Sequence, residues 1–268
     1  MAFRPLRLRL FCAAFLIAAL GSPAWCQALQ ATTSEIAPAG RLRVGFQIGS
    51  PILARRAPDG SVSGIAVDLG KFIAERLGVT FDAVIYANQE AYARSFGNGE
   101  WDMAIGVRSM SAEEKSDMGP DFMLADALYI AAPGREFTDA TKIDQSGVKV
   151  GVSQGGGSDQ VLSRTLRSAL VVRVPGGVPN AVEALRAGTV DVWAANTITL
   201  EEIADALPGS KVIPGAWATG RYAASLPRGR SLAARERFAK IVNEAKRTGL
   251  VQRSIERSGF KDVRVAPE

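Results

Sequence analysis

The first half of the chain alternates short apolar runs with longer segments in which apolar residues recur every three or four positions. The short runs predict strands at residues 42–46, 80–86 and 103–106, and the longer segments predict helices at residues 67–77 and 89–96. Gly78 follows the first helix, at the place where a left-handed backbone commonly ends one. This alternation predicts an α/β architecture with a largely parallel sheet.

The same order of elements returns in the second half. Strands are predicted at residues 148–152, 170–174 and 190–194, and helices at residues 159–167 and 180–186. Short echoes support a duplicated architecture: Gly99 and Asp102 precede one strand as Gly188 and Asp191 precede another. We interpret these residues as structural, because glycine can end a helix and aspartate can bond local backbone at a turn.

Two crossings between the halves are predicted. The apolar stretch 125–133 leaves the first half, and residues 212–223 return to it, so that residues 222–226 rejoin the first sheet as a strand. Helices at residues 232–246 and 250–258 close the chain. The predicted fold class is therefore α/β with two lobes, each a mostly parallel sheet flanked by helices, joined by a two-strand hinge. Lobe 1 is expected at residues 41–130 plus 222–260, and lobe 2 at residues 131–221.

The amino terminus has the layout of a secretory signal. Arg4, Arg7 and Arg9 precede an apolar core at residues 10–20, and small or polar residues lead to a cleavage site near Ala28. We expect residues 1–28 to be a cleaved signal peptide and the mature protein to be periplasmic. A retained single-span anchor is the alternative, and Cys26 raises the further alternative of lipid attachment.

Composition narrows the chemistry that is available. The chain contains no histidine, which excludes Ser-His catalysis and His-ligated metals. Its two cysteines, Cys12 and Cys26, would leave with the signal peptide, so no disulfide or thiol site is expected. Removal of the three arginines of the signal would lower the net charge of +5 by three, and no basic run remains to favour nucleic acid. No metal and no cofactor are expected.

Candidate ligand-binding residues follow from the position of loops at the carboxyl ends of parallel strands, where open α/β sheets bind small molecules. Arg108 can clamp a carboxylate with two parallel hydrogen bonds, or it can be a salt-bridged surface residue. The glycine-rich turn at residues 154–158 can present free amides to an anion, or it can be a tight turn that Ser158 caps. This turn lacks the Lys-Ser/Thr of a P-loop. The predicted ligand-binding residues are Gln47, Ser50, Arg108, Ser109, Gly156, Gly157, Ser158 and Asn196.

Several stretches together resemble one known family. The stretches that carry the resemblance are the opening RLRVGF, the pattern D-G-x-x-x-G, a helix that begins V-D-L and ends in L-G, the segment EALRAGTVDVW and the tail FAKIVNEAKRTGLVQRSIERSGF. In these stretches the chain resembles bacterial extracellular solute-binding proteins of the polar amino-acid type, family 3. The resemblance covers residues 41–260. It implies the type II periplasmic-binding fold, capture of an amino acid or related small carboxylate by hinge closure, and presentation of that ligand to an ABC transporter permease. We expect the protein to be a monomer.

The sequence departs from the family at the ligand site. The family places an arginine where this chain has Ser111-Ala112-Glu113-Glu114, and it uses a Gly-Thr-Thr turn where this chain has Gly155–Ser158. The aspartate that faces the ligand's ammonium group in the family corresponds to Asn196, and the family's aromatic residues are missing from residues 50–53. A small carboxylate without an ammonium group therefore fits about as well as an amino acid. An enzyme of the dehydratase kind on the same fold, or a ligand-sensing partner of a signalling receptor, are the alternative functions.

Overall fold

The computed structural model describes residues 24–48, 51–260 and 263–268, and the predicted signal segment lies largely outside them. One nine-stranded sheet runs through the molecule in the order β4-β1-β5-β10-β6-β9-β7-β8, with β11 paired to β6. The strands of this sheet are β1 (Arg41–Gln47), β4 (Thr80–Tyr86), β5 (Met103–Val107), β6 (Ser116–Ala131), β7 (Lys149–Ser153), β8 (Leu170–Val174), β9 (Val192–Asn196), β10 (Lys211–Pro227) and β11 (Val263–Val265). A separate short hairpin pairs β2 (Arg55–Arg56) with β3 (Val62–Ser63).

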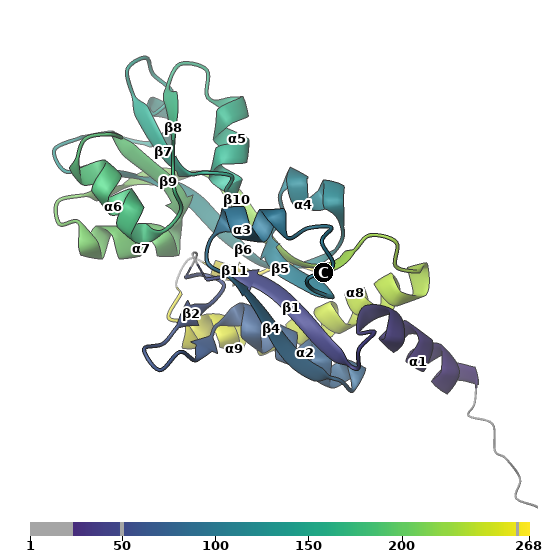
Figure 1. The fold of residues 1–268 in the computed structure, drawn as a ribbon. Coiled ribbons are helices and arrows are strands. Elements are labelled where there is room, and N and C mark those ends of the chain that lie inside the picture. The colour runs from purple at the N-terminus through teal and green to yellow at the C-terminus, as the bar shows by residue number, and fades with distance from the viewer. Residues whose placement is uncertain (1–23, 49–50, 261–262) are drawn as a thin grey trace, which may run out of the picture.

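Two lobes occupy the two ends of the sheet (Figure 1). In the first lobe β1 pairs in parallel with β4 and β5, and in the second lobe β7 pairs in parallel with β8 and β9. The long antiparallel strands β6 and β10 run from one lobe to the other. The predicted α/β class is confirmed. Each lobe has its own set of parallel strands, and β6 and β10 connect the two sets.

The crossing strands explain how one sheet serves two lobes. Residues Tyr222 to Ser225 of β10 pair antiparallel with β5, so the chain rejoins the first lobe as the sequence predicted. At its other end, β6 pairs with β9 from Ala127 to Ala131. The register between β6 and β10 shifts between Ile213 and Ala218, which breaks the regular ladder between the two lobes.

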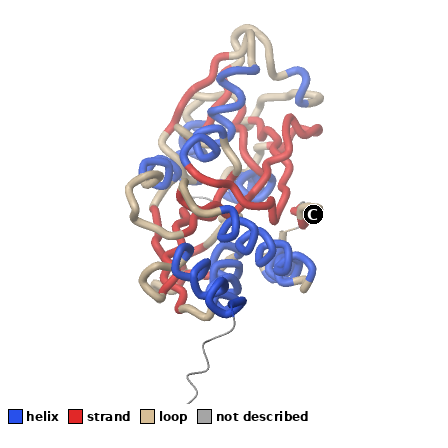
Figure 2. Tube along the Cα trace, turned by 90° about the vertical axis from the view of Figure 1, so that its right-hand side faces the viewer, coloured by secondary structure: helices blue, strands red, loops and turns tan. Residues whose placement is uncertain are grey.

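Helices cover the strands in both lobes, as the view rotated by 90° also shows (Figure 2). They are α1 (Ala24–Ile36), α2 (Ile65–Leu77), α3 (Gln89–Arg94), α4 (Met110–Lys115), α5 (Gly157–Thr165), α6 (Val178–Arg186), α7 (Thr197–Ala206), α8 (Leu232–Arg247) and α9 (Leu250–Arg257). Helix α2 ends as predicted at Gly78, whose left-handed backbone lets its N–H bond the carbonyls of Ala74 and Glu75. Within the described residues, no helix is both long enough and apolar enough to cross a bilayer.

The duplicated Gly-x-x-Asp segments have one structural role in both lobes. Gly99 and Gly188 have the expected positive φ, 71° and 66°, but the two aspartates bond remote and not local backbone. Asp102 accepts hydrogen bonds from the backbone N–H and the guanidinium of Arg43, at distances of 3.0 and 2.7 Å. Asp191 accepts likewise from the backbone N–H of Lys149 at 2.8 Å and from the guanidinium of Arg135. Each buried aspartate therefore ties its own strand to the start of a neighbouring strand, which a local turn motif could not reveal.

Helix α1 spans the predicted cleavage position near Ala28. Its second half packs on α8, where a guanidinium nitrogen of Arg237 donates to the hydroxyls of Thr32 and Thr33 at 2.8 and 2.6 Å. Ile36 is fully buried in the core of the first lobe. A chain cut near Ala28 would therefore keep the part of α1 that contributes to this core.

Candidate functional site

A cavity of about 440 Å³ lies between the two lobes. Its walls come mostly from loops at the carboxyl ends of strands β1, β4, β5, β7, β8 and β9, together with the central parts of β6 and β10. Strand-end loops from both lobes thus face one space, as expected for small-molecule sites in open α/β sheets.

Seven of the eight predicted residues line this cavity. They are Gln47, Arg108, Ser109, Gly156, Gly157, Ser158 and Asn196, whereas Ser50 lies outside the described residues. Their convergence from four separate segments follows from the topology of the two lobes. Whether they bind a ligand stays a prediction.

On the first lobe, Gln47 and Ser109 form a neutral polar part of the wall. Gln47 is buried at the end of β1, and its side-chain NH₂ donates to the Gln89 side-chain oxygen at 3.3 Å. The Ser109 hydroxyl accepts the backbone N–H of Ala112 at 3.3 Å, so Ser109 is the N-cap of α4. This part of the wall presents amide and hydroxyl groups.

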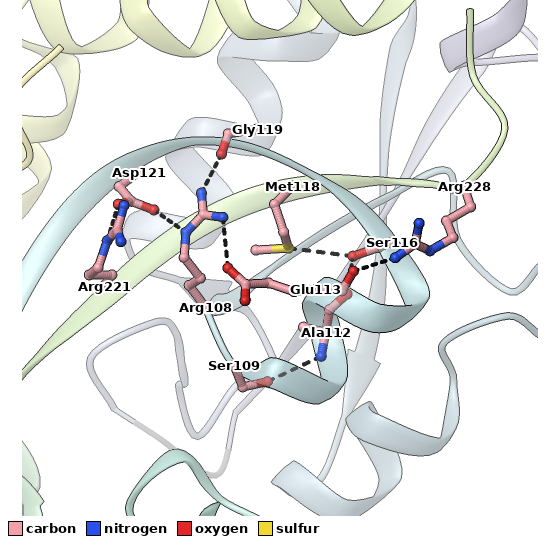
Figure 3. Close-up of polar contacts among 10 residues, drawn as sticks. All are labelled: Arg108, Ser109, Ala112, Glu113, Ser116, Met118, Gly119, Asp121, Arg221 and Arg228. Carbon is pink, nitrogen blue, oxygen red and sulfur yellow. Dashed lines mark hydrogen bonds and ion pairs between the residues drawn. The ribbon is translucent and has the colours of Figure 1, made fainter. Parts of the chain in front are cut away.

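Arg108 is held by the protein itself (Figure 3). Its Nε donates to Asp121 at 2.6 Å, and its two terminal nitrogens donate to the Glu113 carboxylate at 3.2 Å and to the Gly119 carbonyl at 2.6 Å. Asp121 also accepts from Nε of Arg221 at 2.5 Å, so one carboxylate orients two arginines. Because all three nitrogens of Arg108 already have acceptors, the salt-bridged alternative describes this geometry.

On the second lobe, the glycine-rich turn leads directly into α5. Gly155 has a φ of 70°, and the N-cap of the helix is Gly156, so Ser158 lies in the first turn and is not the cap. The amides of Gly157 and Ser158 are first-turn groups without intrahelical acceptors. Both residues line the cavity.

The negative charge of Asp159, next to this turn, is paired with the guanidinium of Arg173. The Asp159 carboxylate accepts hydrogen bonds from Nε of Arg173 and from the Gly155 N–H, each at 2.9 Å. Burial opposes the ionised form of this carboxylate. The hydrogen bonds from Gly155, Ser163 and Arg173 nevertheless hold the pKa of Asp159 below its usual value.

Asn196 caps α7, a helix that the sequence analysis did not predict. Its side-chain oxygen accepts the backbone N–H of Thr199 at 3.0 Å. Burial raises the pKa of the neighbouring Tyr222, and a hydrogen bond with Asn196 partly offsets this effect. The capping role of its side chain is enough to explain an asparagine at position 196, and no ligand is needed for this explanation.

Sequence reasoning missed part of the lining. The pairs Asn88-Gln89 and Gly176-Gly177 follow strands β4 and β8, so the strand-end rule could have found them. The aromatic residues Trp193, Trp217 and Tyr222 come from β9 and β10 and had no local signal. Trp217 donates its indole N–H to the Leu128 carbonyl at 3.0 Å and lies 5.8 Å from the Tyr129 ring, so its position is fixed.

Contacts between the lobes flank the cavity. The side-chain NH₂ of Gln160 on α5 donates to the hydroxyl of Ser111 on α4 at 3.3 Å. Arg55 of the β2–β3 hairpin forms an ion pair with Glu202 on α7 at 2.5 Å. These contacts join the first lobe to the second without passing through β6 or β10.

Comparisons with known proteins establish the fold. No family model matches the chain, and no curated protein does. A mutant of ArgBP from T. maritima is 21% identical with a TM-score of 0.72, covering 85% of this chain and 99% of its own. The solute receptor for L-cysteine of Neisseria gonorrhoeae is 16% identical with a TM-score of 0.73, covering 88% and 99%. An ancestral amino acid-binding protein, a precursor of cyclohexadienyl dehydratase, is 19% identical with a TM-score of 0.72, covering 86% and 100%.

These solved structures are two-lobed binding proteins, and the chain has their fold. The resemblance stated from the sequence is thus confirmed for the type II periplasmic-binding fold.

Proposed function

We propose that this protein is a solute receptor that captures one small polar molecule, an amino acid or a related carboxylate, between its two lobes. The observation that carries this proposal is the 440 Å³ cavity, which strand-end loops of both lobes enclose. A molecule bound there would contact both lobes at once, which is the condition for a ligand to favour a closed arrangement. The amino-acid ligands named for the similar structures support the same class.

The hinge of this receptor would be β6 and β10, with lobe boundaries near those predicted from the sequence, at residues 131 and 221. The irregular pairing between Ile213 and Ala218 gives the hinge fewer regular hydrogen bonds to break. The contacts Gln160–Ser111 and Arg55–Glu202 would form on closure and break on opening. Ligand capture would then shift the population toward the closed form.

Export and delivery complete the proposal. A signal peptide over residues 1–28 would place the mature protein in the periplasm as a monomer, where the closed form would be presented to the permease of an ABC importer. The support is the arginine-rich start and the apolar core at residues 10–20.

An enzyme is the second candidate, because one similar structure is a binding protein that is a precursor of a dehydratase. Acid–base chemistry would need a carboxyl group in the cavity. Glu113 is the only carboxylate among the described lining residues, and it is bonded to Arg108. Incubation of the purified protein with its bound molecule decides between the two: a receptor returns the molecule unchanged, and a new product identifies an enzyme.

The receptor function is tested on protein purified without denaturation. Small molecules released by acid precipitation are identified by mass spectrometry, and the stripped, refolded protein is titrated with them by calorimetry. Small-angle scattering with and without the ligand reports on closure. We expect one-to-one binding and a smaller radius of gyration with ligand, whereas a radius that never changes would contradict hinge closure.

A further inference from the structure

The cavity holds few charges, and they are unevenly distributed. Among its described lining residues, only Arg108, Glu113 and Arg221 carry a charge at neutral pH. The other polar side chains are neutral amides, hydroxyls and indoles, namely Gln47, Asn88, Gln89, Ser109, Ser153, Ser158, Gln160, Trp193, Asn196, Thr199, Trp217, Thr219 and Tyr222. The net charge of the lining is therefore positive.

The carboxylates near the cavity are already paired. Glu113 accepts from Arg108 at 3.2 Å and is 48% exposed. Asp121 is 10% exposed and accepts from both Arg108 and Arg221. Asp126 follows the lining residue Ala125, but it accepts from Thr219 at 2.8 Å and from an arginine of β11. Among the described residues around the cavity, a ligand cation would find no unpaired carboxylate.

Donors for an anion are available from two sides. Arg221 is 59% exposed, and Asp121 holds it through Nε. Within the part of the chain that the structure describes, the two terminal nitrogens of Arg221 form no hydrogen bond. Across the cavity lie the first-turn amides of Gly157 and Ser158. A guanidinium edge and a pair of amides are both suited to carboxylate oxygens.

We infer that the ligand is a small organic acid that carries a carboxylate and no ammonium or guanidinium group. This inference rests on the proposed receptor function and narrows its ligand class. An acid would place its carboxylate between Arg221 and the start of α5, and its remaining atoms against neutral amides and the rings of Trp217 and Tyr222. A buried ammonium group would lack a counter-charge there, which is strongly unfavourable.

The first test uses the molecule that co-purifies with the native protein, together with matched pairs of probes. The extract is treated with an amine-reactive label before mass spectrometry. Stripped protein is titrated with leucine against 4-methylpentanoate, and with phenylalanine against 3-phenylpropionate. We expect an unlabelled carboxylic acid in the extract and tighter binding of the acid in each pair that binds, by at least about tenfold.

The outcomes separate this inference from the receptor function. A bound molecule with an ammonium or guanidinium group, or without a carboxylate, overturns the inference and leaves the receptor in place. A native extract without any small molecule, together with no binding by any probe, overturns both.

Two variants test the assigned residues, and a third variant is the control. Arg221→Gln should weaken binding of the acid by about tenfold or more. Arg186→Gln removes the same charge from the exposed face of α6, outside the cavity, and should change affinity less than about twofold. Glu113→Gln removes the one negative charge of the described lining and should raise the affinity for the acid. If Glu113→Gln instead abolishes binding, Glu113 leaves Arg108 to pair with a ligand cation and the inference is wrong.

Discussion

Gly157 offers a direct test of whether the lobes close on each other. It is the first residue of α5 in the second lobe, and a β-carbon added there would lie 3.6 and 3.7 Å from the two methyl groups of Val107, at the end of β5 in the first lobe. These are ordinary van der Waals distances, so Gly157→Ala should be accepted in the closed form. A leucine at this position has no such space, because its further carbons must enter the volume that Val107 or the ligand occupies.

The magnitude follows from packing. Forcing extra carbon atoms into an occupied interior costs roughly 1–3 kcal/mol. Since the two residues belong to different lobes, this cost falls on the closed form alone. The dissociation constant of Gly157→Leu should therefore rise by roughly 5- to 150-fold, whereas the free energy of unfolding without ligand should change by less than about 1 kcal/mol.

Calorimetry with the co-purified ligand measures the affinity, and small-angle scattering measures closure. Thr165→Leu, at the exposed far end of the same helix, is the matched control and should bind like the unmodified protein. If Gly157→Leu binds its ligand with unchanged affinity and still compacts, then Gly157 and Val107 do not meet across a closing cleft.

Three further predictions concern stability and closure. Asp102→Ala should lower the free energy of unfolding by about 3 kcal/mol, because it leaves the buried N–H and the guanidinium of Arg43 without their carboxylate partner. Denaturant titration measures this change. Asp82→Ala, which removes an exposed 3.7 Å ion pair, is the control and should cost less than about 1 kcal/mol. Glu202→Gln removes a partly exposed ion pair between the lobes and should weaken ligand binding by about two- to fivefold in low salt; an equal effect in high salt would contradict an electrostatic origin. A hydrogen bond from Arg264 keeps the pKa of Asp126 below its usual value, so this residue's stabilisation is present above the unfolded pKa near 4 and is lost as pH falls through the lower folded pKa. Thermal melts should therefore show a smaller loss of stability below pH 4 for Asp126→Asn than for the unmodified protein, and parallel curves would count against this role.

The sequence alone determined the order of elements and the edge of the sheet at which the site lies. The predicted strands at residues 80–86 and 170–174 coincide with β4 and β8, because short apolar runs between turn residues are a local signal. The helix at residues 67–77 differs from α2 by two residues at its start. Small-molecule sites in open α/β sheets lie at the carboxyl ends of the strands, and this rule selected loops that the structure brings to one cavity. The carboxyl end of each predicted strand can be identified from the sequence, because a strand runs in the direction of the chain.

Several elements lacked such a signal. Helix α7 combines β-branched and acidic residues in a short segment after a strand, and no helix was predicted there. The first half of β6 contains Gly119 and Pro120, which mark a turn by themselves and enter a strand here because β10 pairs with it. Residues 1–28 were expected to be a cleaved signal peptide, and no helix was predicted for the residues that follow it. Contacts with α8, some 200 residues later in the chain, fix the second half of α1.

The roles of individual side chains were decided only by the tertiary structure. Arg108 was a candidate clamp for a carboxylate, but Asp121 on β6 and Glu113 on α4 occupy its guanidinium. Arg221, which carried no motif, faces the cavity instead. A strand and the turn that ends it have signals among neighbouring residues, so the sequence could predict where the strands end. The partner of a charged side chain is set by the distance in space to residues that are remote in the chain, and only the folded arrangement of the two lobes supplies that distance.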